Sequence, residues 1–141
     1  ENLNFFATVF HTTVQANYPL IADIYRQIEP FKKRPAGKLS GGMKQKLGLC
    51  CALIHDPDLL ILDEPLHGAG HSFAQKLGQL LVRLNRELGM TVLLAEQQLS
   101  FIRRVADRFC MLYRGRNVAQ GHVNELDDEL IAHWMSREAR R

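Results

Sequence analysis

Residues 39–65 read LSGGMKQKLGLCCALIHDPDLLILDEP, and this stretch decides the fold of the 141-residue chain. Ser40 is a residue type that caps helices, so we expect a helix to start there and to run to about Ile54. Four consecutive apolar residues, Leu59–Leu62, then predict a buried strand with helices over both faces, because a strand covered on both sides needs no polar alternation. A helix followed by such a strand indicates the α/β class.

On the C-terminal side of this stretch, strands and helices continue to alternate. Apolar residues at helical spacing predict a helix over residues 73–88, with Gly89 as its C-terminal cap, and a shorter helix over 99–106. Further strands are predicted at Thr91–Ala95, Phe109–Tyr113 and Val118–Gln120. A turn at residues 114–117 makes the last two strands a hairpin, which we expect to close the otherwise parallel sheet.

The first 55 residues differ in character and predict a mainly helical layer, with Pro19 suited to the first turn of a helix. We therefore expect three parts: a helical subdomain over 1–55, a core over 56–121, and a C-terminal helix with a basic tail over 122–141. The middle part holds the predicted parallel strands.

The composition excludes several classes of protein. Hydrophobic residues make up 46% of the chain, which suits a globular core, and the net charge of +3 is too modest and too dispersed to predict nucleic-acid binding. Apolar runs are far shorter than the roughly 20 residues of a membrane-spanning helix, and no secretory signal opens the sequence, so a cytosolic location is expected. The three cysteines lack the spacing of a zinc site and are expected to be buried: Cys50, Cys51 and Cys110.

Two sites in the stretch 39–65 carry chemistry, the first at the start of the predicted helix. Free N–H groups and the positive end of the helix dipole favour an anion there, and Gly41 and Gly42 let a phosphate approach the backbone. The alternative is an ordinary Ser40 cap with a flexible entry.

The second site is the end of the predicted strand, where Asp63 and Glu64 emerge at the carboxyl edge of a parallel sheet. One carboxylate can hold Mg²⁺ while its neighbour polarises an attacking water. The alternative is a solvated strand end that Pro65 stops.

In combination, these two sites resemble the ABC (ATP-binding cassette) ATPase family. Its signature loop usually reads Leu-Ser-Gly-Gly-Gln, and here Leu39–Gly42 agree while Met43 replaces the glutamine. The Walker B strand of the family matches through Leu62–Pro65. The resemblance extends from Glu1, in a segment like the one just after the family's Q-loop, to about Gly121.

The resemblance implies a P-loop NTPase-like α/β fold: half of a parallel sheet, preceded by a helical signature subdomain. It also implies roles for single residues in binding ATP and Mg²⁺. Ser40 and the amides of Gly41, Gly42 and Met43 would contact the γ-phosphate of an ATP held by a facing subunit. Asp63 would support Mg²⁺ and Glu64 would act as general base.

Besides Met43, the sequence departs from the family in three further places. The P-loop pattern Gly-x-x-x-x-Gly-Lys-Ser/Thr is absent, which truncation would explain, so we expect the chain alone to be inactive. In the loop after Walker B, Gly70 stands where the family has an aspartate of the D-loop. Gln97 stands at the switch-histidine position, where it can donate a hydrogen bond to a γ-phosphate oxygen but cannot carry an imidazolium charge.

As a member of this family the chain would be an ATP-hydrolysing subunit of a transporter. Its expected partners are a second ABC ATPase subunit and transmembrane permease subunits at the cytoplasmic face of the cell membrane, with no nucleic acid. The pair Glu96-Gln97 is similar to the ATPases of importers of branched-chain amino acids or urea, so a cargo of amino acid or urea type is expected. Met43–Leu47 is similar to drug exporters, which leaves the direction of transport open. A non-catalytic half that offers its signature loop to a partner's ATP stays open.

Overall fold

The computed structural model describes residues 1–68 and 70–136, and the chain divides into two compact units, Glu1–Glu96 and Gln97–Arg141. The basic tail expected at the C-terminus lies outside the described residues from 137 onward. This division differs from the three parts expected above, which follow the functional regions of the resembled family and stay a prediction. None of the described helices has the length and apolarity to cross a bilayer.

Three helices build the N-terminal part of the first unit: α1 (Asn2–Val9), α2 (Tyr18–Tyr25) and α3 (Gly41–Leu53). Two short 3₁₀ turns, Glu29–Phe31 and Ala36–Lys38, connect α2 to α3. As predicted, Pro19 lies in the first turn of α2 and Ser40 caps α3. The interior contains fully buried apolar side chains from α2, α3 and the residue after it: Ile21, Ile24, Leu53 and Ile54.

A parallel two-stranded sheet completes the first unit, with β1 (Leu59–Asp63) and β2 (Thr91–Ala95) paired in register from Leu59 opposite Thr91 to Asp63 opposite Ala95. Between them α4 (His71–Arg86) returns the chain, as a parallel pair requires. Gly89 reverses the chain after α4, as predicted, with φ of +69° and its N–H donating to the Asn85 carbonyl at 3.2 Å.

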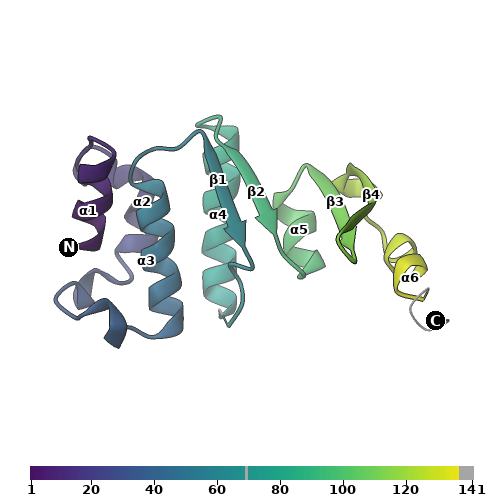
Figure 1. The fold of residues 1–141 in the computed structure, drawn as a ribbon, viewed down its shortest axis with the longest axis horizontal. Helices are drawn as coiled ribbons and strands as arrows, with labels where there is room; N and C mark the ends of the chain where they lie inside the picture. The colour runs from purple at the N-terminus through teal and green to yellow at the C-terminus, as the bar shows by residue number, and fades with distance from the viewer. Residues whose placement is uncertain (69, 137–141) are drawn as a thin grey trace. The chain divides into compact units, whose positions relative to one another are not determined.

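The expectation that helices cover both faces of β1 is wrong for the described residues. Leu60 is buried at 3% exposure, whereas Ile61 is 63% exposed and Leu93 on the neighbouring strand 59% exposed. The described residues place α4 against one face of the sheet and leave the other to solvent (Figure 1). Because side chains alternate along a strand, every second apolar residue therefore faces water.

The second unit contains α5 (Leu99–Val105), the strands β3 (Arg108–Tyr113) and β4 (Arg116–His122), a 3₁₀ turn at Val123–Glu125, and α6 (Asp128–Ser136). The predicted hairpin is present: β3 and β4 are antiparallel, and the turn residues Arg114 and Gly115 have φ of +49° and +74°. Positive φ at both positions is what a two-residue hairpin turn requires. The hairpin is a separate two-stranded sheet and does not extend β1–β2, which corrects the expectation of one closed sheet.

Candidate functional site

The first part of the candidate site is the start of α3. Ser40 has extended backbone angles, φ −65° and ψ 161°, and its Oγ accepts a hydrogen bond from the Met43 N–H at 3.4 Å. Gly41 and Gly42 begin the helix, where first-turn N–H groups have no intrahelical acceptor. A Cβ atom built on either glycine would meet nothing within 4 Å, and no acidic residue stands in the first turn. The helix start is therefore open and favours an anion.

The second part is the end of β1. Asp63 is the last residue of the strand and is exposed, on the same face of the sheet as Ile61. The Glu64 N–H donates to the Ala95 carbonyl at 2.9 Å, which continues the pairing of β1 with β2 by one residue. Glu64 has φ of +43°, a left-handed conformation that costs a non-glycine residue on the order of 1 kcal/mol and persists only where surrounding contacts hold it.

The contacts that hold Glu64 lie in the loop that follows it, residues 64–67. The His67 N–H donates to the Glu64 carbonyl at 2.9 Å and closes a turn. His67 Nδ1 lies 3.8 Å from Glu64 Oε2. On the sheet side, the Leu66 N–H donates to Glu96 Oε2 at 3.3 Å, and on the helix side, Gln45 Nε2 donates to the His67 carbonyl at 2.6 Å.

Gln45 and Glu96 are site residues that sequence reasoning missed. In the sequence, Gln45 belongs to the signature stretch and to the exporter-like Met43–Leu47, and Glu96 to the importer-like pair with Gln97, and neither pattern predicts a contact for them. No spacing rule predicts that a glutamine inside a helix bonds a carbonyl 22 residues later. In Figure 1, α3 and β1 run in opposite directions, so α3 begins at the end of the unit where β1 finishes. The structure thus brings the two candidate parts to the same end of the unit.

Gln97 is the one predicted site residue outside the first unit. It is exposed and opens the second unit, one residue before Gln98, which precedes α5. The other predicted site residues all belong to the first unit: Ser40, Gly41, Gly42, Met43, Asp63 and Glu64.

The donor set is suited to Mg²⁺ bound mainly by water and phosphate. Among the described residues no three His, Cys, Asp or Glu side chains converge as a metal cage, and Asp63 offers a single exposed carboxylate. Mg²⁺ usually keeps several waters and takes one or two carboxylates together with substrate phosphates. An Asp63–Mg²⁺–phosphate arrangement is therefore chemically consistent, whereas a closed protein site is not.

The cysteines offer no nucleophile for this site. Burial raises the pKa of the Cys50 thiol to about 12 and also raises the pKa of Cys51, so both are thiols near neutral pH. Cys110 on β3 is exposed, contrary to expectation, because it occupies an outward position of a two-stranded sheet.

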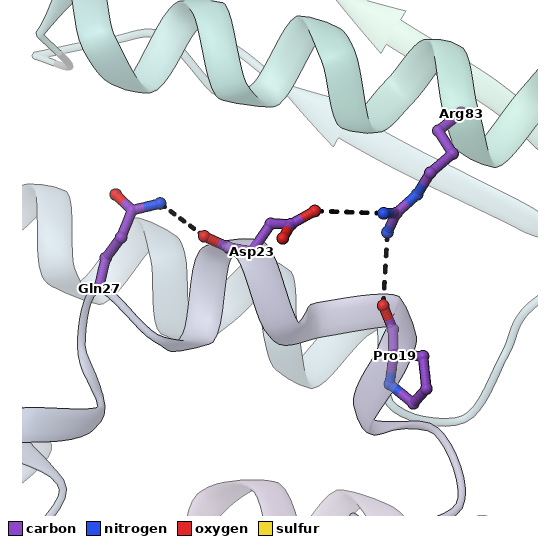
Figure 2. A network of polar contacts seen from close by, with 4 residues as sticks. All are labelled: Pro19, Asp23, Gln27 and Arg83. Atoms are coloured by element: carbon purple, nitrogen blue, oxygen red, sulfur yellow. Dashed lines mark hydrogen bonds and ion pairs between the residues drawn. The ribbon is translucent and has the colours of Figure 1, made fainter.

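A hollow in the first unit lies away from the candidate site. Asp23, Lys76, Gln79, Leu80 and Arg83 line it, and none of them is a predicted site residue. Arg83 links α4 to α2 beside this hollow, through Nη1 to Asp23 Oδ2 at 3.1 Å and Nη2 to the Pro19 carbonyl at 3.4 Å (Figure 2). These contacts support the packing of two helices and suggest no chemistry.

Known proteins are similar to this chain over the residues of the candidate site. A family model described as ABC transporter matches residues 10–67, which include the α3 start, β1 and the loop after it. The Nod factor export ATP-binding protein I of Sinorhizobium fredii is 39% identical over 138 residues, covering 93% of this chain and 38% of the relative. Its counterpart in Burkholderia orbicola is 37% identical over 137 residues, covering 93% and 43%. The chain thus spans about two fifths of the length of these relatives (38% and 43%).

Solved structures agree with the fold. A dimeric ATP-binding cassette in a post-hydrolysis state with ADP and Pi is 28% identical, with a TM-score of 0.59 over 62% of this chain and 37% of that one. A cassette from Clostridium perfringens, part of an ABC transporter complex, is 25% identical, with a TM-score of 0.66 over 95% of this chain and 59% of that one. The parallel pair β1–β2 and its helices therefore have the architecture of these cassettes.

Proposed function

Because this chain belongs to the ATP-binding domains of ABC transporters, we propose that the whole protein binds and hydrolyses ATP to drive a solute across a membrane. The observation that carries the proposal is the pair of carboxylates at the carboxyl end of β1, joined through the 64–67 turn to the helix whose start is open to an anion. Phosphoryl transfer needs both features, since catalysis there is mainly positioning and charge stabilisation.

At the start of α3, the Ser40 hydroxyl and the N–H groups of Gly41, Gly42 and Met43 bind the γ-phosphate of an ATP held by a facing subunit. The open space at the two glycines supports this assignment, because no side chain would keep a phosphate from the backbone. The 3.4 Å bond from the Met43 N–H to Ser40 Oγ is long, so a phosphate oxygen can replace it at small cost.

At the end of β1, Asp63 supports Mg²⁺ and Glu64 is the general base. When bound, Mg²⁺ neutralises phosphate charge. The Glu64 carboxylate accepts a proton from the attacking water. The oxygen of that water adds to the γ-phosphorus while the bond from the γ-phosphorus to the ADP oxygen breaks. Gln97 donates a hydrogen bond to a γ-phosphate oxygen, a role assigned from sequence position alone.

The direction of transport that the relatives favour is export. Those compared above are named export ATP-binding proteins, in agreement with the exporter-like Met43–Leu47 stretch. The importer assignment from Glu96-Gln97 receives no support from them. The proposed partners are a second ATP-binding subunit and transmembrane permease subunits, with the ATPase on the cytoplasmic face of the membrane. Those permease subunits would select the cargo.

The experiment that tests the proposal measures Mg-ATP turnover with the chain added to an intact cassette subunit of a relative whose own signature serine is replaced by alanine. We expect the chain to restore turnover, because Ser40 supplies the missing phosphate contact in trans, and Ser40→Ala in the chain to abolish it. No restoration by the unaltered chain would contradict the assignment of Ser40.

A second measurement separates a catalytic subunit from a non-catalytic half. In the full-length protein Glu64→Gln should lower kcat by about 10²-fold or more with little change in the affinity for ATP, the usual effect of removing a general base. Unchanged kcat in Glu64→Gln, with turnover still dependent on Ser40, would identify the non-catalytic half that Gly70 in place of the D-loop aspartate suggests.

A further inference from the structure

We propose that Gln45 is a positioning residue for Glu64, which holds the turn 64–67 in place from helix α3. The assignment rests on the proposed function, since the role of Glu64 as general base belongs to it. Gln45 itself touches neither substrate nor reacting atoms; it acts through the backbone of His67.

The contact is short and has a defined direction. Gln45 Nε2 donates to the His67 carbonyl at 2.6 Å, and the reverse orientation of the amide would set two oxygens against each other. The Oε1 atom of the same amide is buried and has no hydrogen-bond partner among the described residues. The bond to His67 is therefore what sets the direction of this amide.

Each end of the 64–67 turn is held by a different element. The Glu64 N–H is bonded to Ala95 of β2, and the Leu66 N–H to the Glu96 carboxylate that follows β2. Gln45 provides the contact to α3 at the far end of the turn, on His67, whose own N–H closes the turn onto the Glu64 carbonyl. Removing Gln45 removes the contact that this far end makes with α3.

The backbone conformation of Glu64 depends on the turn that Gln45 helps to hold. With φ of +43°, Glu64 stays left-handed only while the turn is held, and relaxation to a negative φ would redirect its carboxylate. A general base must reach its proton at hydrogen-bond distance, and a displacement of about 1 Å can cost 10²-fold in rate. Gln45 also lies in α3, the helix that Ser40 caps, so it connects the proposed phosphate-binding helix start to the proposed base.

The first experiment measures backbone amide exchange in Gln45→Met, which keeps the side-chain volume but removes the donor. We expect the His67 amide to exchange about tenfold faster, since the turn opens more often once a hydrogen bond is lost. Gln27→Met is the matched control: Gln27 Nε2 also donates to a backbone carbonyl, that of Asp23 at 2.8 Å, but within α2 and its C-terminal turn (Figure 2). Unchanged exchange at His67 in Gln45→Met overturns the proposal.

The second experiment measures steady-state ATP hydrolysis by the full-length protein. Gln45→Met should lower kcat about tenfold and leave KM for ATP unchanged, Gln45→Lys should recover part of the loss because it retains a nitrogen donor, and Gln27→Met should match the parent. An unchanged kcat in Gln45→Met, even with faster exchange at His67, overturns the positioning role. If the unsubstituted full-length protein shows no turnover, the proposed function itself fails, which is distinguishable from both results.

Discussion

At the candidate site, some proposed contacts use the backbone and others use the side chain. At the start of α3 the family glutamine is replaced by Met43, yet the group proposed to bind phosphate there is the backbone N–H, which any residue other than proline supplies. At the end of β1, in contrast, the proposed roles require the carboxylates themselves, and the left-handed φ of Glu64 adds a conformational constraint. We therefore expect substitution to be tolerated at position 43 more readily than at 63 or 64.

The cysteines provide a residue-level prediction that needs no ligand. At pH 8 Cys110 should react with a thiol reagent such as Ellman's reagent within minutes, while Cys50 and Cys51 react only after unfolding. Burial keeps the reagent away from the Cys50 thiol and also disfavours its ionisation. Because burial raises the pKa of Cys50 to about 12, its thiolate fraction stays small until the pH approaches that value.

Mass spectrometry of the labelled peptides measures this difference, and Cys110→Ser is the control that should remove the fast phase. Rapid labelling of Cys50 in the folded chain at pH 8 would contradict its burial.

At the scale of elements, α4 is the helix that connects the two strands of the parallel sheet in the first unit. It carries a stripe of buried apolar side chains at helical spacing: Phe73, Leu77, Leu80, Leu81 and Leu84. Its polar contact to α2, Arg83 with Asp23, lies at the surface, with the two side chains 33% and 60% exposed. Exposed ion pairs contribute little, so apolar burial dominates the attachment of α4.

Two adjacent positions of α4 test this difference. Leu84→Ala should lower the free energy of unfolding by about 3 kcal/mol, since it removes a fully buried side chain and leaves a cavity. Arg83→Ala, the neighbouring control, should lower it by less than about 1 kcal/mol. Urea denaturation of both variants measures the values, and similar losses for the two would show that α4 is not held by its apolar stripe.

For the molecule as a whole, the β1–β2 sheet has one face covered by α4 and one face with exposed apolar side chains: Leu59, Ile61 and Leu93. These residues gather on one side because of the parallel register, in which Leu59 lies opposite Thr91 and Ile61 opposite Leu93. Contiguous exposed apolar surface of this kind promotes association.

We therefore expect the 141-residue chain to self-associate at high concentration, and Ile61→Thr to reduce this because threonine keeps strand propensity while lowering apolar exposure. Sedimentation velocity across a concentration series measures the effect. Val82→Thr, on an exposed position of α4, is the matched control and should behave like the parent. Equal effects of the two substitutions would show that the sheet face is not responsible.

Much of the fold was predictable because its signals are local. A cap at Ser40, helical spacing along α4, a glycine with positive φ after it, and the turn at Arg114-Gly115 each depend on a few neighbouring residues, and all are confirmed. The family resemblance of the stretch 39–65 also needed the sequence alone, and the relatives and the solved cassettes bear it out. The site roles drawn from it remain predictions for the measurements above.

The tertiary structure decided what depends on contacts between distant segments. An apolar run predicts that a strand is buried, but it does not predict which face other elements cover. The exposure of Ile61 and of Cys110 therefore could not be inferred. The hydrogen bond from Gln45 to the His67 carbonyl and that from the Leu66 N–H to Glu96 join residues 22 and 30 positions apart, which no periodicity encodes. The sequence by itself determined the main helices and strands and the family resemblance, because backbone propensity and motifs are local. Packing alone decided which side chains hold Glu64, because hydrogen-bond partners are chosen in space.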